Sequence, residues 1–263
     1  MVTFNLYNDI QLNSTPKRIV SLVPSQTELL IDLGLEKHVV GITKFCTHPY
    51  HLKQTKKIVG GTKNIKLDTI KALNPDIILC NYEENTKAIV DACSEIAPVH
   101  VSEIYTIEDT VTLISIYGTL FSCRTEATRI IHKLNYKLHD FKAFIKDVPK
   151  KKVAYFIWRE PWMVAGSNTF INHMLELNNF ENIYAKQARY PVVTLEKIRL
   201  DGDPDLVLLS SEPYPFKEKH AFEIGRRTHH AKTIFVDGEL FSWYGSRLLK
   251  SFDYFKQLHH RII

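Results

Sequence analysis

A repeated unit constrains the fold of this 263-residue chain more than any other feature. The segment LDTIKALNPDIILC, from Leu67 to Cys80, is similar to LEKIRLDGDPDLVLLS, from Leu195 to Ser210. Each copy combines a short helix that carries an acidic residue, a Pro-Asp turn and an uninterrupted apolar run. Proline disfavours helical geometry in the residue before it, and such an apolar run is typical of a parallel strand covered on both faces. The repeat predicts two α/β lobes of related design.

Further segments of both halves follow the same alternation. We expect strands at residues 18–23, 39–42 and 99–101 of the first half and 152–158 and 234–236 of the second, with helices at 26–33 and 169–177. Strands that alternate with helices predict parallel sheets built from βαβ units. The fold class is therefore α/β, with two Rossmann-like lobes.

A long amphipathic helix is predicted at residues 122–148, where Pro149 ends it. Its apolar residues recur at steps of three and four: Ala127, Ile130, Ile131, Leu134, Leu138, Phe141 and Ile145. At 1.5 Å per residue this helix spans roughly 38 Å, which is long for a local crossover. We expect an N-terminal lobe at 1–121, a rigid connecting helix at 122–148 and a C-terminal lobe at 149–263. The alternative is an ordinary helix packed on one sheet.

Charge and hydropathy exclude several classes of function. The net charge of +5 is spread along the chain, so no basic face for nucleic acid is predicted. No apolar stretch is long enough to span a membrane. The first 18 residues lack the features of a secretory signal. We therefore expect either that a leader has been removed from this numbering or that the protein is cytoplasmic.

Motifs of metal clusters and of nucleotide or hydrolase sites are also missing. The four cysteines, at 46, 80, 93 and 123, form no CxxC pair, which disfavours a zinc cluster and leaves a disulfide open. GxGxxG, GxxxxGK[ST], HExxH and GxSxG do not occur. These absences disfavour an enzyme.

The loops after the predicted strands are rich in aromatic residues. Open α/β sheets bind ligands outside the carboxyl ends of their strands. The residues expected there are Phe45, His48, Tyr50, Tyr82, Trp158, Trp162, Tyr190, Tyr214, Phe216, Phe241, Trp243 and Tyr244. Aromatic rings with a few polar groups suit a large, flat, partly apolar ligand.

Several segments resemble one known family. RIVSLVPSQTELLIDLG, VVGITKFCTHP and LDTIKALNPDIILCNYEEN are similar to the first lobe, and LEKIRLDGDPDLVLL and FSWYGSRLLKSFDYF to the second lobe, of the helical-backbone (class III) periplasmic substrate-binding proteins of ABC importers. Within that family the likeness is closest to the cobalamin-binding proteins. The resemblance implies two lobes joined by one rigid helix and a cobalt corrinoid captured between them for delivery to a membrane permease. It also implies an extracytoplasmic monomer with no intrinsic cofactor.

The resemblance assigns two kinds of site. His48 and Tyr190 correspond to family aromatics of the ligand site, whereas a family tryptophan near Thr62 has no aromatic counterpart. The residues predicted to bind the ligand are His48, Cys46, Tyr82, Trp162, Tyr190, Phe241, Trp243 and Arg247. Asp68 and Glu196, equivalent in the repeat, correspond to the surface carboxylates that dock on permease arginines. An acid in a first helical turn also favours the helix dipole, which is the structural alternative for both.

Three alternatives remain open at this point. The ligand could be haem or a ferric siderophore, and converging Arg159, Arg189 and Arg247 would favour the siderophore. The chain could also be a cytoplasmic corrinoid or metal-chelate binder without a transporter. A Cys46–His48 nucleophile–base pair would suit an enzyme, but no orienting partner is recognisable.

His48 could be an axial ligand of cobalt or iron, or it could pack edge-on against the ligand or hydrogen-bond one of its side amides.

Overall fold

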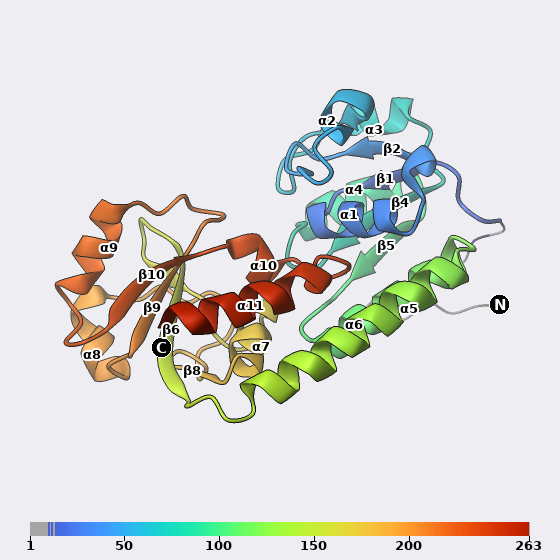
Figure 1. The fold of residues 1–263 in the computed structure, drawn as a ribbon. Helices are drawn as coiled ribbons and strands as arrows, with labels where there is room; N and C mark the ends of the chain where they lie inside the picture. The colour runs from blue at the N-terminus through green and yellow to red at the C-terminus, as the bar shows by residue number, and fades with distance from the viewer. Residues whose placement is uncertain (1–9, 11, 13, 263) are drawn as a thin grey trace. The chain divides into compact units, whose positions relative to one another are not determined.

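The computed structural model describes residues 10, 12 and 14–262 and divides them into two compact units. Unit 1 extends to Tyr136 and includes Trp243–Leu249, and unit 2 consists of Lys137–Ser242 and the segment from Lys250 onward. Figure 1 shows an α/β arrangement in each unit, which confirms the predicted fold class.

Unit 1 is built on a five-stranded parallel sheet. The strand order is β3-β2-β1-β4-β5, and all four pairings are parallel. The strands are β1 (Ile19–Ser21), β2 (Val39–Ile42), β3 (Lys57–Ile58), β4 (Ile77–Asn81) and β5 (Val99–Ser102). The helices are α1 (Pro24–Asp32), the 3-10 turn η1 (Glu36–His38), α2 (Leu52–Thr55), α3 (Leu67–Ala72), α4 (Lys87–Ser94) and α5 (Ile107–Leu120).

Unit 2 contains a second five-stranded sheet, with one antiparallel pair. Its order is β10-β9-β6-β7, and β8 also pairs with β6. The strands are β6 (Lys151–Trp158), β7 (Met163–Val164), β8 (Phe180–Asn182), β9 (Leu206–Ser210) and β10 (Lys232–Val236). The helices are α7 (Phe170–Leu177), the 3-10 turn η2 (Leu195–Lys197), α8 (Ile198–Asp201), α9 (Glu218–Gly225), α10 (Gly238–Ser242) and α11 (Leu248–Ile262). The antiparallel partner of β6 is β7, which the sequence did not predict.

The two copies of the repeat form equivalent elements. The first copy folds into α3 and β4, and the second folds into η2, α8 and β9. All residues of β4 and β9 are buried, as expected for strands covered on both faces. The apolar runs therefore lie at the centre of each unit, and the acidic residues of the repeat lie in the first turns of α3 and η2.

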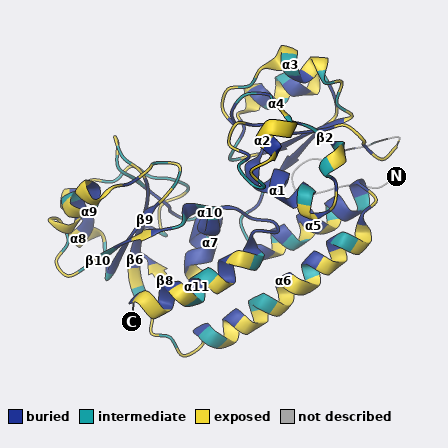
Figure 2. Ribbon diagram, turned by 45° about the horizontal axis from the view of Figure 1, so that its top comes forward, coloured by how far each residue is buried: buried dark blue, intermediate teal, exposed yellow. Residues whose placement is uncertain are grey.

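The long helix forms as α6 (Arg124–Ile145), a few residues shorter than predicted. Its residues Ala127, Ile130, Leu134, Phe141 and Ile145 are buried, while the rest of its surface is largely exposed (Figure 2). In unit 2 it packs against α11, where Phe141 contacts Phe252 and Phe255 at ring-centroid distances of 5.7 and 5.9 Å. The boundary between the units falls inside this helix, after Tyr136.

The predicted C-terminal lobe at 149–263 differs from unit 2 in one segment. Residues Trp243–Leu249 belong to unit 1, although they follow the strands of unit 2 in sequence. They are held there by side chains of α1: Gln26 hydrogen-bonds Tyr244, and Glu28 forms an ion pair with Arg247. Contacts of this kind, 218 and 219 positions apart in sequence, are invisible to local pattern.

The structure also describes the state of the cysteines and the character of the helices. All four cysteines are buried and unbonded, so no disulfide forms. Within residues 10, 12 and 14–262, none of the helices has the length and apolar character needed to cross a bilayer.

Candidate functional site

In unit 1, a buried polar network joins the carboxyl ends of β4 and β5 to the start of α1. The Gln26 side-chain amide donates to Tyr244 Oη at 2.9 Å and to Ser102 Oγ at 2.5 Å, and its Oε1 accepts from Tyr117 Oη at 2.7 Å. Asn81 Nδ2 donates to the Ser102 carbonyl at 3.0 Å. Burial raises the pKa of the Tyr244 phenol, so it stays protonated. The network fixes this edge of the sheet.

A buried ion pair in unit 1 holds Trp243. Arg247 contacts Glu28 through two hydrogen bonds of 2.7 and 3.1 Å, and both side chains are only 6% exposed. The guanidinium carbon of Arg247 lies 4.8 Å from the ring centroid of Trp243, a cation–π contact. Arg247 was predicted to bind ligand. In the structure Arg247 pairs with Glu28 and supports Trp243. Its direct contact with the ligand stays a prediction.

His48 lies beside this tryptophan. The two rings meet edge to face, with centroids 5.5 Å apart, and the imidazole is half-buried. The loop after β2 thus brings together two residues that the sequence assigned to the ligand site from opposite ends of the chain. Tyr82, which follows β4, is 46% exposed, and its contact with the ligand stays a prediction.

Cys46 is less accessible than the sequence analysis assumed. Its thiol is fully buried, with Thr27 Oγ1 at 3.2 Å and Thr43 Oγ1 at 3.3 Å. Burial raises the pKa of the Cys46 thiol, and the two threonine hydrogen bonds only partly oppose this. A protonated thiol is a poor nucleophile and a poor soft ligand, so the observed surroundings favour a structural role.

In unit 2, aromatic side chains gather beyond the carboxyl ends of β6 and β9. Trp158 contacts Tyr214 at 5.5 Å between ring centroids, and Trp162 stacks on Phe216 at 6.1 Å with an interplanar angle of 6°. Trp158 remains 39% exposed and Trp162 is half-buried. The sequence placed these rings in loops, and the structure shows that they form one continuous cluster.

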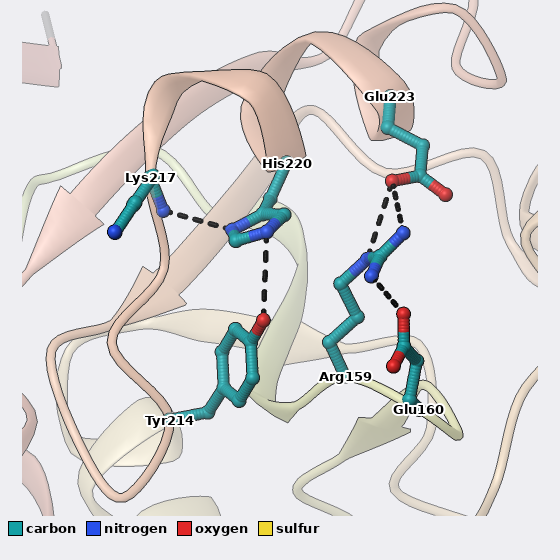
Figure 3. Close-up of polar contacts among 6 residues, drawn as sticks. All are labelled: Arg159, Glu160, Tyr214, Lys217, His220 and Glu223. Carbon is teal, nitrogen blue, oxygen red and sulfur yellow. Dashed lines mark hydrogen bonds and ion pairs between the residues drawn. The ribbon is translucent and has the colours of Figure 1, made fainter.

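A positive side chain borders this aromatic cluster (Figure 3). Arg159 donates to Glu223 Oε2 from Nε at 3.3 Å and from a terminal nitrogen at 3.1 Å, and it also pairs with Glu160. Its guanidinium carbon lies 5.4 Å from the Trp162 ring centroid. Glu223 therefore orients Arg159 along the ring and offsets its charge.

His220 supports the same cluster from α9 (Figure 3). Its Nδ1 accepts from the Lys217 backbone N–H at 2.9 Å, which places the ring proton on Nε2, 3.5 Å from Tyr214 Oη. Burial, assisted by nearby Lys219, lowers the pKa of His220, so the imidazole is neutral and holds Tyr214 in place.

Phe241 lies in the core of unit 2, so the loop position predicted for it is wrong, while its role as a wall of the ligand site stays a prediction. It belongs to α10 rather than a loop, and its side chain is 0% exposed. Its ring contacts Tyr155 at 5.2 Å and Phe255 at 4.8 Å, inside unit 2. An aromatic residue in an apparent loop was instead a core residue of a short helix. Tyr190 is half-buried in unit 2, and its ligand contact stays a prediction.

The two predicted docking carboxylates are both exposed, one in each unit. Asp68 lies in the first turn of α3 and Glu196 in the first turn of η2. Glu196 pairs with Arg227 at 3.2 Å, and both side chains remain more than half exposed. Exposure keeps the docking assignment available, although a partner protein would compete with Arg227 for Glu196.

Three residues that shape these surfaces were not predicted from sequence. Glu28 and Glu223 each orient an arginine, and His220 orients Tyr214. Charged residues in helices are usually solvated, and nothing local distinguishes these from the others. An acid inside the apolar segment TELLIDLG was the one available signal, since buried charge needs a partner.

The comparisons with known proteins agree with this architecture. Residues 19–233 match the family described as periplasmic binding protein. This range spans most of the chain, so the chain belongs to the periplasmic binding protein family.

Individual relatives and solved structures are similar to the chain over most of its length. The chain is 26% identical over 253 residues to an uncharacterised ABC transporter substrate-binding lipoprotein of Bacillus subtilis, covering 92% of this chain and 79% of the relative. It is 22% identical over 200 residues to a vitamin B12-binding protein of Vibrio parahaemolyticus, covering 75% and 72%. The fold is similar to that of a periplasmic vitamin B12-binding protein of Vibrio cholerae, with a TM-score of 0.81, 16% identity and coverage of 94% and 98%. A periplasmic haem-binding protein of Pseudomonas aeruginosa gives a TM-score of 0.80, 20% identity and coverage of 94% and 93%.

Proposed function

We propose that this chain is the substrate-binding protein of an ABC importer and that it captures cobalamin or a related corrinoid for delivery to a permease. Family membership and the relative named as an ABC transporter substrate-binding lipoprotein support the class. The relatives named as vitamin B12-binding proteins support the corrinoid. A binding protein rather than an enzyme also fits the buried, protonated thiol of Cys46.

The observation that carries the proposal is the set of aromatic side chains at the carboxyl ends of the strands. Unit 2 offers the partly exposed Trp158, the half-buried Trp162 and an oriented Arg159, and unit 1 offers the half-buried His48, which packs on the largely buried Trp243. Rigid rings bind a large, flat, partly apolar macrocycle at low entropic cost. The Arg159 charge is offset by Glu223, which suits a corrinoid better than a strongly anionic siderophore.

Haem is the second candidate, and His48 is the observation that favours it. A half-exposed imidazole beside an aromatic wall is a common axial ligand of haem iron. The fold likeness to solved haem-binding proteins is compatible with either ligand. The same surfaces would contact either macrocycle, but the binding of haem would depend more on His48, as its axial ligand.

The experiment is a titration of the purified chain with cyanocobalamin, hemin and a ferric siderophore, followed by absorbance and calorimetry. We expect the corrinoid to bind most tightly. Trp162→Ala should weaken it by about 1–3 kcal/mol, the scale of burying one large side chain. Tyr136→Ala is the matched control, because this aromatic residue is 76% exposed on α6 and should not affect binding. Tighter binding of hemin would replace the first candidate with the second, and binding of none of the three would contradict both.

We further propose that Asp68 and Glu196 dock on the permease and that the protein works outside the cytoplasmic membrane. The exposure of both carboxylates supports the docking role, and the lipoprotein and periplasmic relatives support the location. A cytoplasmic binder without a transporter remains the alternative, and fractionation of the source cells would separate them. A monomer without intrinsic cofactor also stays a prediction.

A further inference from the structure

A cluster of metal-ligating side chains lies in unit 2, away from the aromatic surfaces described above. Asp203, His229 and His230 each present one ligand atom, and these atoms all lie within 4.8 Å of one another. We propose that this cluster binds one divalent transition-metal ion of the zinc type. The proposal is independent of the ligand that the aromatic surfaces bind.

The sheet register brings these residues together. Strands β9 and β10 are parallel, with Leu206 paired to Lys232 at their amino ends. Asp203 and His229 each lie three residues before their member of this pair. The two loops therefore meet at the amino edge of the sheet, whereas the aromatic cluster lies beyond the carboxyl ends.

His230 lies between two carboxylates. Its Nε2 lies 3.2 Å from Asp205 Oδ1, and its Nδ1 lies 3.8 Å from Asp203 Oδ2. A metal-binding histidine usually donates its second ring N–H to a carboxylate, which fixes the tautomer and turns the other lone pair toward the ion. Asp205 is placed to accept the N–H of His230 Nε2, and this would leave Nδ1 of His230 as the ligand atom.

Asp205 is itself held by the backbone. Its Oδ2 accepts a 2.7 Å hydrogen bond from the Lys152 N–H, and its own carbonyl accepts from the Lys232 N–H at 3.0 Å. Because β6 holds the carboxylate and β10 holds the backbone of the same residue, the carboxylate is restrained when the histidine moves. The orienting group is therefore fixed before any ion arrives.

Asp203 carries an unsatisfied acceptor. Among the residues that the structure describes, its buried Oδ1 has no hydrogen-bond partner. Its backbone has a φ of 46°, which a non-glycine residue seldom adopts. A cation held by this carboxylate would satisfy an acceptor whose burial is otherwise costly.

The donor set selects the kind of ion. Two imidazoles and one carboxylate suit zinc and its neighbours, whereas magnesium and calcium prefer oxygen ligands. Around a tetrahedral zinc ion with bonds of about 2.1 Å, ligand atoms lie about 3.4 Å apart. His229 and His230 are exposed, so their rings are able to close the remaining distance. The fourth position would hold water or a group from outside.

The test uses the untagged full-length chain, stripped with EDTA and titrated with Zn²⁺ by calorimetry and with Co²⁺ by visible absorbance. We expect one ion per chain at this site and an intense Co²⁺ spectrum of four-coordinate type. His229→Ala and Asp203→Asn should each weaken binding at least tenfold, and Asp205→Asn should weaken it by about 10- to 100-fold through the orientation of His230. His229 is exposed, so its replacement should leave the unfolding midpoint unchanged.

The matched control is His51→Ala, which removes an exposed histidine that also contacts a carboxylate, Glu36, at 2.8 Å. It should bind Zn²⁺ as the unmodified chain does. Unchanged Zn²⁺ affinity in both His229→Ala and Asp203→Asn, or Mg²⁺ binding as tight as Zn²⁺, would overturn the proposal. Corrinoid affinity should be the same in all these variants, so a failure here leaves the proposed transport function untouched.

Discussion

His48 is the residue whose chemistry separates the candidate ligands. Its ring meets Trp243 edge to face, a contact that suits packing against a flat ligand. We expect His48→Phe to leave the visible bands of a bound corrinoid unchanged and to alter affinity by less than about 1.5 kcal/mol, as for a swap of similar volume. Absorbance and calorimetry measure both quantities.

Axial ligation by His48 would give the opposite result. The native chain would shift the visible bands of the chelate, and His48→Phe would abolish the shift.

A buried histidine in unit 1 predicts acid sensitivity. His100 is 0% exposed and packs on Tyr117 at 5.8 Å, and burial lowers the pKa of its imidazole to about 4. Between that value and the ordinary pKa near 6.5, the unfolded chain binds a proton that the folded chain does not. Stability should therefore fall as pH drops through this window, by about 3 kcal/mol in full.

The measurement is the urea unfolding midpoint at pH 7 and pH 4.5 for the native chain and His100→Phe, which keeps the aromatic contact. The variant should lose less stability in acid. His132→Phe, at an exposed position, serves as the control and should keep the full loss. Equal acid sensitivity in native chain and His100→Phe would show that other groups dominate.

At the scale of elements, the Glu28–Arg247 pair fastens the Trp243–Leu249 segment to α1. Glu28→Gln removes the carboxylate that pairs with the buried guanidinium of Arg247, so we expect a loss of about 3 kcal/mol in the free energy of unfolding. Asp91→Asn breaks the exposed Lys87–Asp91 pair and should cost less than about 1 kcal/mol. Denaturant unfolding compares the two.

The double variant Glu28→Leu/Arg247→Met tests the cause of that loss. Because it removes both charges, it should recover part of the stability. A double variant that is less stable than Glu28→Gln would mean that packing, rather than loss of the carboxylate partner, accounts for the effect.

At the scale of the whole molecule, the proposed docking role requires both units. We expect Asp68→Lys/Glu196→Lys to abolish binding to the permease while leaving ligand affinity unchanged, because both carboxylates are exposed and neither is among the predicted ligand residues. The attraction between exposed charges should also weaken as salt rises. Binding to permease vesicles at two ionic strengths measures this.

The matched control for docking is Glu108→Lys/Glu181→Lys, which makes the same change in net charge at other exposed positions, one in each unit. It should bind the permease normally. Loss of ligand with retained docking in Asp68→Lys/Glu196→Lys would contradict the assignment.

The sequence by itself determined the elements and their class. The buried strands β4 and β9, the stripe of α6 and the acidic turns of α3 and η2 follow from residue periodicity and proline position, which act over a few residues. The aromatic residues in the loops after β6 and β9 could likewise be predicted, because the strands before them are recognisable in the sequence.

Only the tertiary structure decided which of these residues share a surface. In the folded chain Phe241 and Cys46 are buried. Arg247 pairs with Glu28 and supports Trp243. The parallel register of β9 and β10 placed Asp203 beside His229. Each outcome depends on contacts between residues far apart in sequence, whose energies no local pattern records.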